Sequence, residues 1–156
     1  LMSFNKVIPY TSSVGSKFLI NFKDFQEQEF SLPVVDVSLV LAESAKELLS
    51  LKDLVEIVRI IIDFLNDNQV VLYYYCDSSD ADIFMSERNK QQLPQEFRHN
   101  LFNALFSFMK LDHLVKDEII ISDPINSTHY ISLITKIEDK SALTEVSIAV
   151  QQMDDK

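Results

Sequence analysis

Two stretches early in the chain place an apolar residue at every second position, which is the pattern of half-buried β-strands. They are Lys17–Phe22 and Phe30–Leu41, and the polar residues between them indicate a turn. We therefore predict an antiparallel pair of strands. Pro33 fits the start of the second strand or an edge position, because proline has no N–H to donate. The apolar residues that share one face of each strand are Phe18, Ile20, Phe22, Val35, Val37, Leu39 and Leu41.

The period changes to that of a helix between Leu51 and Asn66. Ser50 and Asp53 have the spacing of a capping box, with Asp in the usual Glu position. Apolar residues recur at every third or fourth position, and others widen the stripe, so we expect the helix to be covered on more than one side. These residues are Leu54, Val55, Ile57, Val58, Ile60, Ile61, Ile62, Phe64 and Leu65.

A continuous apolar and aromatic run, Val70–Tyr75, is typical of a central strand buried on both faces. Its three tyrosines could form a surface on which nucleic-acid bases stack, but no basic residues accompany them, so we expect them in the core. Pro94 fits the first position of a second helix. The apolar stripe of that helix is typical of a core face, with a ligand pocket as the alternative. It comprises Phe97, Leu101, Phe102, Leu105, Phe106 and Met109.

Two more strands are predicted at Glu118–Ser122 and Tyr130–Ile137, joined into a hairpin by turn-forming residues. Ser141 is placed to cap a last helix. Residues 1–16 fit either a short edge strand or an ordered, loosely attached tail. The apolar side of the last helix is Leu143, Val146, Val150 and Met153.

The order of these elements predicts an α+β fold with a mainly antiparallel sheet of about five strands and two to three packed helices. The unit from 50 to 76 is expected to place its strand beside an N-terminal one. No linker-like segment interrupts the 156 residues, so residues 1–156 are predicted to form a single domain.

The net charge of −10 changes the picture of possible partners. It disfavours nucleic acid and anionic membrane surfaces, and it favours a basic protein as partner; simple solubility is the alternative explanation. Cys76 is the single cysteine, so no internal disulfide is predicted. No apolar run approaches the ~20 residues of a membrane span. The first residues lack the apolar core of a signal peptide, and we expect a cytoplasmic protein.

Gly15 is the single glycine, which restricts the chemistry that the backbone can support. Phosphate loops, dinucleotide turns, nucleophile elbows and EF-hand loops all require glycine at defined positions. The sequence therefore excludes these motifs, and we lean against an enzyme.

The best candidate site follows the predicted central strand, where Asp77, Asp80 and Asp82 crowd together. Carboxylate oxygens suit Mg²⁺ or Mn²⁺, but the spacing matches no standard metal loop and no cofactor is predicted. The alternative is a solvated turn that caps a helical segment. Arg98 is expected to pair with this loop, or to bind an anionic ligand beside it.

Cys76 ends the predicted central strand and is a candidate nucleophile if a histidine lies beside it in the fold. His99, His113 and His129 are the three histidines of the chain. The alternative is a small core residue, which is the usual role of a buried cysteine.

The second half of the chain resembles a family of small uncharacterised bacterial proteins that is common in Bacteroidetes. The matching residues are Tyr74–Asp80, Arg98–Asn103 and Tyr130–Leu133, and the resemblance covers about residues 70–150. In that family an aromatic strand ends in Cys-Asp-x-x-Asp and precedes a helix with Arg and Phe. The family usually has Arg soon after the second Asp, where this chain has Ala81-Asp82. The resemblance implies no activity, but it singles out Asp77, Asp80 and Arg98.

These observations support one leading functional hypothesis and two others. The first is a non-enzymatic protein-binding module, antitoxin-, immunity- or inhibitor-like, with a basic protein as partner. The second is a metal-assisted hydrolase that uses the loop of Asp77, Asp80 and Asp82. The third is a small-molecule sensor with a pocket between the Phe-rich helix and the sheet.

Overall fold

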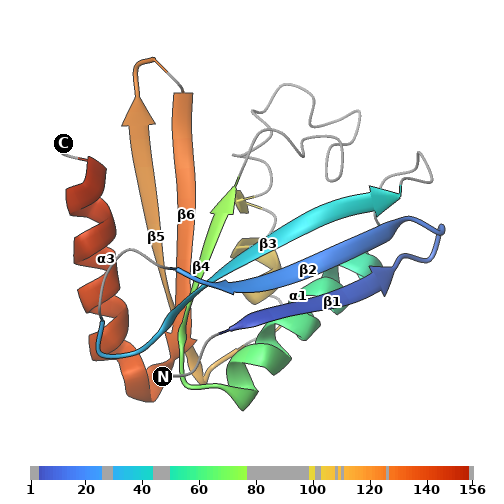
Figure 1. Ribbon diagram of the computed structural model, residues 1–156, viewed down its shortest axis with the longest axis horizontal. Coiled ribbons are helices and arrows are strands. Elements are labelled where there is room, and N and C mark those ends of the chain that lie inside the picture. The colour runs from blue at the N-terminus through green and yellow to red at the C-terminus, as the bar shows by residue number, and fades with distance from the viewer. Residues whose placement is uncertain are drawn as a thin grey trace.

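The computed structural model describes residues 4–25, 30–43, 50–76, 99–100, 103–107, 109, 111–125 and 127–154. Its six described strands form one sheet in the order β1–β2–β3–β4–β6–β5 (Figure 1). The strands are β1 (Asn5–Thr11), β2 (Lys17–Asp24), β3 (Val34–Glu43), β4 (Val71–Cys76), β5 (Leu114–Asp123) and β6 (Ser127–Lys136). Helices α1 (Leu51–Asp67) and α3 (Lys140–Asp154) accompany them, with a 3-10 turn η3 (Ile137–Asp139) before α3. The predicted α+β class is confirmed.

The sheet is mixed, and it has more strands than the predicted number of about five. β3 and β4 pair in parallel, from Val34 opposite Val71 to Val37 opposite Tyr74, whereas the other neighbouring strands are antiparallel. Parallel neighbours need a crossover connection, and α1 supplies it. The unit from 50 to 76 thus places its strand beside an N-terminal one, as predicted.

The additional strand is β1, at one edge of the sheet. It pairs with β2 along its whole length, so the edge-strand prediction is right for Asn5–Thr11. Gly15 lies in the turn between the two strands with φ +94, a conformation that residues with a side chain rarely adopt. The Ser16 N–H donates to Ser12 Oγ at 3.0 Å and closes this turn.

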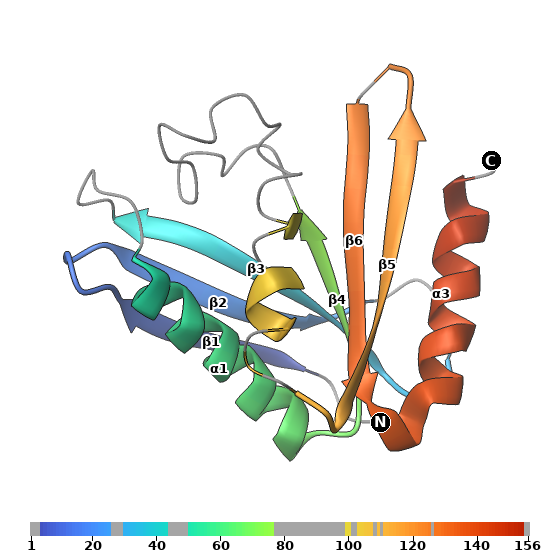
Figure 2. The same cartoon turned by 180° about the vertical axis from the view of Figure 1, so that it is seen from behind.

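α1 covers one face of the sheet, across β1, β2 and β3 (Figure 2). The alternating residues of β2 and β3 that the sequence predicted on one face belong to this core; they are Phe18, Ile20, Phe22, Val35, Val37 and Leu39. The rings of Phe22 and Phe64 stack with their centroids 4.0 Å apart. Helical residues 103–107 add Leu105 and Phe106 to the same core, so this described part of the Phe-rich stripe is core, as predicted.

α3 covers the opposite face, over β4, β5 and β6. Its predicted apolar residues Leu143, Val146 and Val150 are buried there. The connection between β2 and β3 also reaches α3, because the Ser31 N–H donates to the Glu145 carboxylate at 2.8 Å. β4 therefore has a core on both sides, and the tyrosines of its apolar run belong to these cores.

At two places the bounds of the elements in the structure differ from those predicted from the sequence. The hairpin strands are longer than predicted, because pairing continues without a break from Leu114 opposite Lys136 to Asp123 opposite Ser127. α3 begins at Lys140, so Ser141 lies inside its first turn and is not its cap, because η3 leads directly into the helix. None of the helices in the described ranges is long and apolar enough to cross a membrane.

Candidate functional site

The described residues that come directly before and after the predicted aspartate loop, Cys76 and His99, both lie next to Tyr130 of β6. Cys76, the last residue of β4, is the register partner of Tyr130. The ring centroid of His99 lies 5.0 Å from that of Tyr130. The predicted site residues themselves lie outside the described residues; they are Asp77, Asp80, Asp82 and Arg98.

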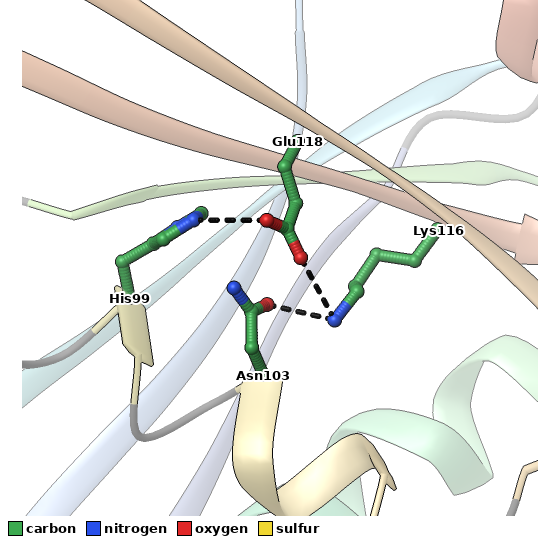
Figure 3. Close-up of polar contacts among 4 residues, drawn as sticks. All are labelled: His99, Asn103, Lys116 and Glu118. Carbon is green, nitrogen blue, oxygen red and sulfur yellow. Dashed lines mark hydrogen bonds and ion pairs between the residues drawn. The ribbon is translucent and has the colours of Figure 1, made fainter.

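Four polar side chains meet beside Tyr130: His99, Asn103, Lys116 and Glu118 (Figure 3). Lys116 and Glu118 are two residues apart on β5, so they point to the same face of the sheet. The Glu118 carboxylate lies between two nitrogens, with one oxygen 3.3 Å from His99 Nε2 and the other 3.1 Å from Lys116 Nζ. Lys116 Nζ also donates to Asn103 Oδ1 at 2.7 Å. The cluster therefore fastens the helical residues His99 and Asn103 to β5.

The negative charge of Glu118 in this cluster is offset by the positive charge of Lys116. Burial by itself raises the pKa of Glu118, but the hydrogen bond and charge of Lys116, together with His99, hold that pKa below its ordinary value. The carboxylate stays ionised and both of its oxygens are occupied. His99 is 3% exposed, and in the part of the chain that the structure describes its Nδ1 has no hydrogen-bond partner.

A small cavity lies beside the cluster, between the sheet and residues 103–107. Its volume of about 10 Å³ is the space of about one water molecule. An open groove of about 320 Å³ along the start of β5 shares Phe106, Lys116 and Ile134 with it. The enclosed cavity lies where a sensor pocket was predicted, but its size suits a water and not an organic ligand. It is lined by Val37, Ile61, Leu72, Tyr74, Asn103, Phe106, Lys116, Ser132 and Ile134.

The three histidines have different surroundings. His113 contacts an asparagine of α1 at the surface. His129 hydrogen-bonds the Tyr75 hydroxyl through Nδ1. The side chain of Cys76 lies outside the described part of the chain, so its pairing with His99 or another histidine stays a prediction. Across the described ranges, no three His, Cys, Asp or Glu side chains come together as a metal site.

A second polar cluster, which the sequence did not reveal, surrounds Asp53 at the start of α1. Asp53 is 2% exposed, and it accepts hydrogen bonds from the Tyr10 hydroxyl at 2.8 Å and the Ser50 hydroxyl at 2.8 Å. Its carboxylate also accepts from the Ser13 N–H at 3.0 Å and the Ser13 hydroxyl at 2.9 Å. The capping box is readable from Ser50 and Asp53, whereas Tyr10 and Ser13 are distant in sequence. The cluster fastens the turn after β1 to α1.

The Asp53 carboxyl has a strongly shifted pKa. Burial raises this pKa, but the hydrogen bonds from Tyr10, Ser50 and Ser13 outweigh burial and lower it to about 2. Burial and the neighbouring carboxylate raise the pKa of Tyr10 to about 12. Since Asp53 is enclosed by its own donors, it has a structural role.

β5 forms the second edge of the described sheet, and it exposes Ile120 together with the polar residues Glu118 and Ser122. Within the part of the chain that the structure describes, β5 pairs with β6 alone. Ile120 is 58% exposed, and Ile125, at the turn, is 89% exposed. The hairpin extends past the end of β4, which pairs with β6 no farther than Tyr130 (Figure 1). No Lys or Arg occurs from Asp117 to Thr135. This surface protrudes, exposes two isoleucines beside polar residues and has no Lys or Arg between Asp117 and Thr135.

Comparison with known proteins leaves the chain without a match: no protein-family model, no curated protein and no solved structure matches it.

Proposed function

We propose that the protein is a non-enzymatic binding module that captures a basic partner protein through the β5–β6 hairpin. An antitoxin-, immunity- or inhibitor-like role fits a module of this size and charge. The His99–Glu118 cluster supports a non-enzymatic role, because the Glu118 carboxylate is engaged with Lys116 and His99, and Lys116 also donates to Asn103.

The observation that carries the proposal is the exposure of Ile120 and Ile125 on a hairpin that has no Lys or Arg between Asp117 and Thr135. Exposed isoleucine gains free energy when a partner removes it from water. The charged residues from Asp117 to Thr135 are all acidic, apart from the titratable His129. An acidic, apolar surface complements a partner with apolar and basic residues, and the net charge of −10 speeds the encounter.

The test is a pull-down of the tagged protein from cells of its native host at about 0.1 M and about 1 M salt, where the Debye length falls from about 10 Å to about 3 Å. Mass spectrometry identifies what co-purifies, and the tag alone is the control. We expect a stoichiometric partner with a basic isoelectric point, retained at low salt and lost at high salt.

Two results contradict the proposal. One is capture that salt does not weaken, which excludes electrostatic recognition. The other is no partner at either salt concentration. In that second case, a saturable increase in melting temperature with Mg²⁺ or Mn²⁺, lost in Asp80→Ala, would favour the metal-assisted hydrolase.

A further inference from the structure

We infer that the edge of β5 that has no strand partner within the described residues binds by strand addition, and that its ligand is an extended segment with consecutive apolar residues flanked by Lys or Arg. This inference rests on the proposed function for the basic character of the partner. The inference goes beyond the proposed function because it assigns the strand that binds, the binding mode and the kind of sequence in the bound segment.

The two edges of the sheet differ in how well they resist strand addition. Sheet edges are commonly protected by proline, lysine or short length, because an open edge carries unpaired N–H and C=O groups. β1 has both Lys6 and Pro9. The second half of β5 begins with Ile119–Ile121, a β-branched run without charge or proline. The Ile119–Ile121 segment of β5 therefore lacks the protection that Lys6 and Pro9 give to β1.

The side chains of Ile119–Ile121 alternate between the two faces of the sheet, so they would contact side chains of an added strand on both faces. Ile120 is 58% exposed and points to the face covered by α1. Ile121 is half-buried on the face covered by α3. Directly opposed side chains of neighbouring strands contact each other, so a bound strand needs apolar residues at consecutive positions there.

The charged residues of β5 determine which residues we expect on either side of the apolar positions in the bound strand. Asp117 precedes the isoleucine run and Asp123 follows it. Lys116 and Glu118 pair with each other, so their charges offset one another. Opposite charges on neighbouring strands stabilise the pairing and like charges destabilise it. The bound segment is therefore expected to carry Lys or Arg on each side of its apolar residues, which is the general strand-addition mode with a basic preference.

The test uses a capped synthetic peptide with three consecutive valines flanked on each side by two lysines. Backbone NMR of the full chain locates its binding site, and titration gives the dissociation constant. The same peptide with glutamate in place of lysine is the ligand control. Ile120→Lys is the informative variant. Val7→Lys is the matched control, because Val7 is a 49% exposed β-branched residue on the opposite edge strand and the charge change is identical.

We expect the lysine peptide to shift the β5 amide signals and slow their hydrogen exchange. Ile120→Lys should weaken binding about tenfold or more, and Val7→Lys less than about twofold. The inference is overturned if the peptide does not bind, if it protects amides elsewhere, or if both variants bind alike. It is also overturned if β5 pairs with a second copy, seen as a dimer of the free chain that Ile120→Lys dissociates. Any of these failures leaves a salt-sensitive partner in the pull-down unaffected, so the two proposals fail separately.

Discussion

At the scale of single residues, Asp53 does more than its place in the sequence suggests. A carboxylate at the third position of a helix ordinarily completes a capping box. Here the same carboxylate also accepts hydrogen bonds from Tyr10 and from Ser13 in the turn after β1. One buried charge thus joins the N-terminal strand pair to α1, and its hydrogen bonds keep it ionised.

Asp53→Asn should lower the free energy of unfolding at pH 7 by about 2 kcal/mol, because the charged acceptor of several donors is lost. The pKa of Asp53 is lowered when folded, so its stabilising effect is present above the unfolded value of 3.8 and is lost as pH falls toward about 2. Urea unfolding of both proteins at pH 7 and near pH 2 measures this effect. The difference between them should shrink at low pH. An equal difference at both pH values would show that the carboxylate charge is not its cause.

Gly15 is a second residue whose replacement should lower the free energy of unfolding by a predictable amount. Its φ of +94 strains any residue with a side chain, although a Cβ there meets no atom within 4 Å. Gly15→Ala should therefore lower the free energy of unfolding by about 1 kcal/mol through backbone strain alone. Ser13→Ala tests the hydroxyl in the same turn. A Gly15→Ala protein as stable as the parent would contradict the assigned turn conformation.

At the scale of elements, the contact of β5 with the helical residues His99 and Asn103 depends on Lys116 and Glu118. We expect the Lys116→Met and Glu118→Gln substitutions to destabilise less together than the sum of their separate effects, with a coupling of about 1 kcal/mol. The control is the exposed pair of Lys17 and Glu43, whose nitrogen and oxygen are 3.3 Å apart. Exposed pairs couple weakly, so that cycle should give close to zero. Equal coupling in the two cycles would mean that the cluster does not fasten β5.

Periodicity in the sequence predicted most of the elements that the structure describes. α1, β2, β3 and the hairpin follow from local patterns, because one face of each is buried against the rest of the chain. For residues 1–16 the sequence does not decide between a strand and a tail, since Pro9 and the exposed residues of β1 interrupt the alternation. Its place in the sheet depends on pairing with β2, which is a contact and not a local pattern.

The candidate sites were less predictable for the same reason. The aspartates at 77, 80 and 82 stand out because they are close in sequence, but they lie outside the described residues. The His99–Glu118 contact joins residues 19 apart, and Tyr10–Asp53 joins residues 43 apart. No spacing rule brings such pairs together. The exposure of Ile120 also depends on β5 being the last strand of the sheet.

At the scale of the whole molecule, the fold separates a well-packed body from an exposed edge. Helices cover both faces of the central strand β4, and the β1 edge carries lysine and proline. The β5 edge combines apolar residues with acidic ones and stands beyond the end of β4 (Figure 1). The charge of −10 opposes contact between copies of the protein, and under the proposed function it attracts a basic partner to this edge.

The most direct measurement is quantitative capture of the co-purifying partner by the parent protein, by Ile120→Lys and by Val7→Lys, at low salt and equal bait concentration. Both variants add the same charge, and both replace exposed β-branched residues on edge strands. If the β5 edge recognises the partner, the parent and Val7→Lys will capture similar amounts and Ile120→Lys will capture about a tenth or less. Equal capture by all three proteins would contradict the account.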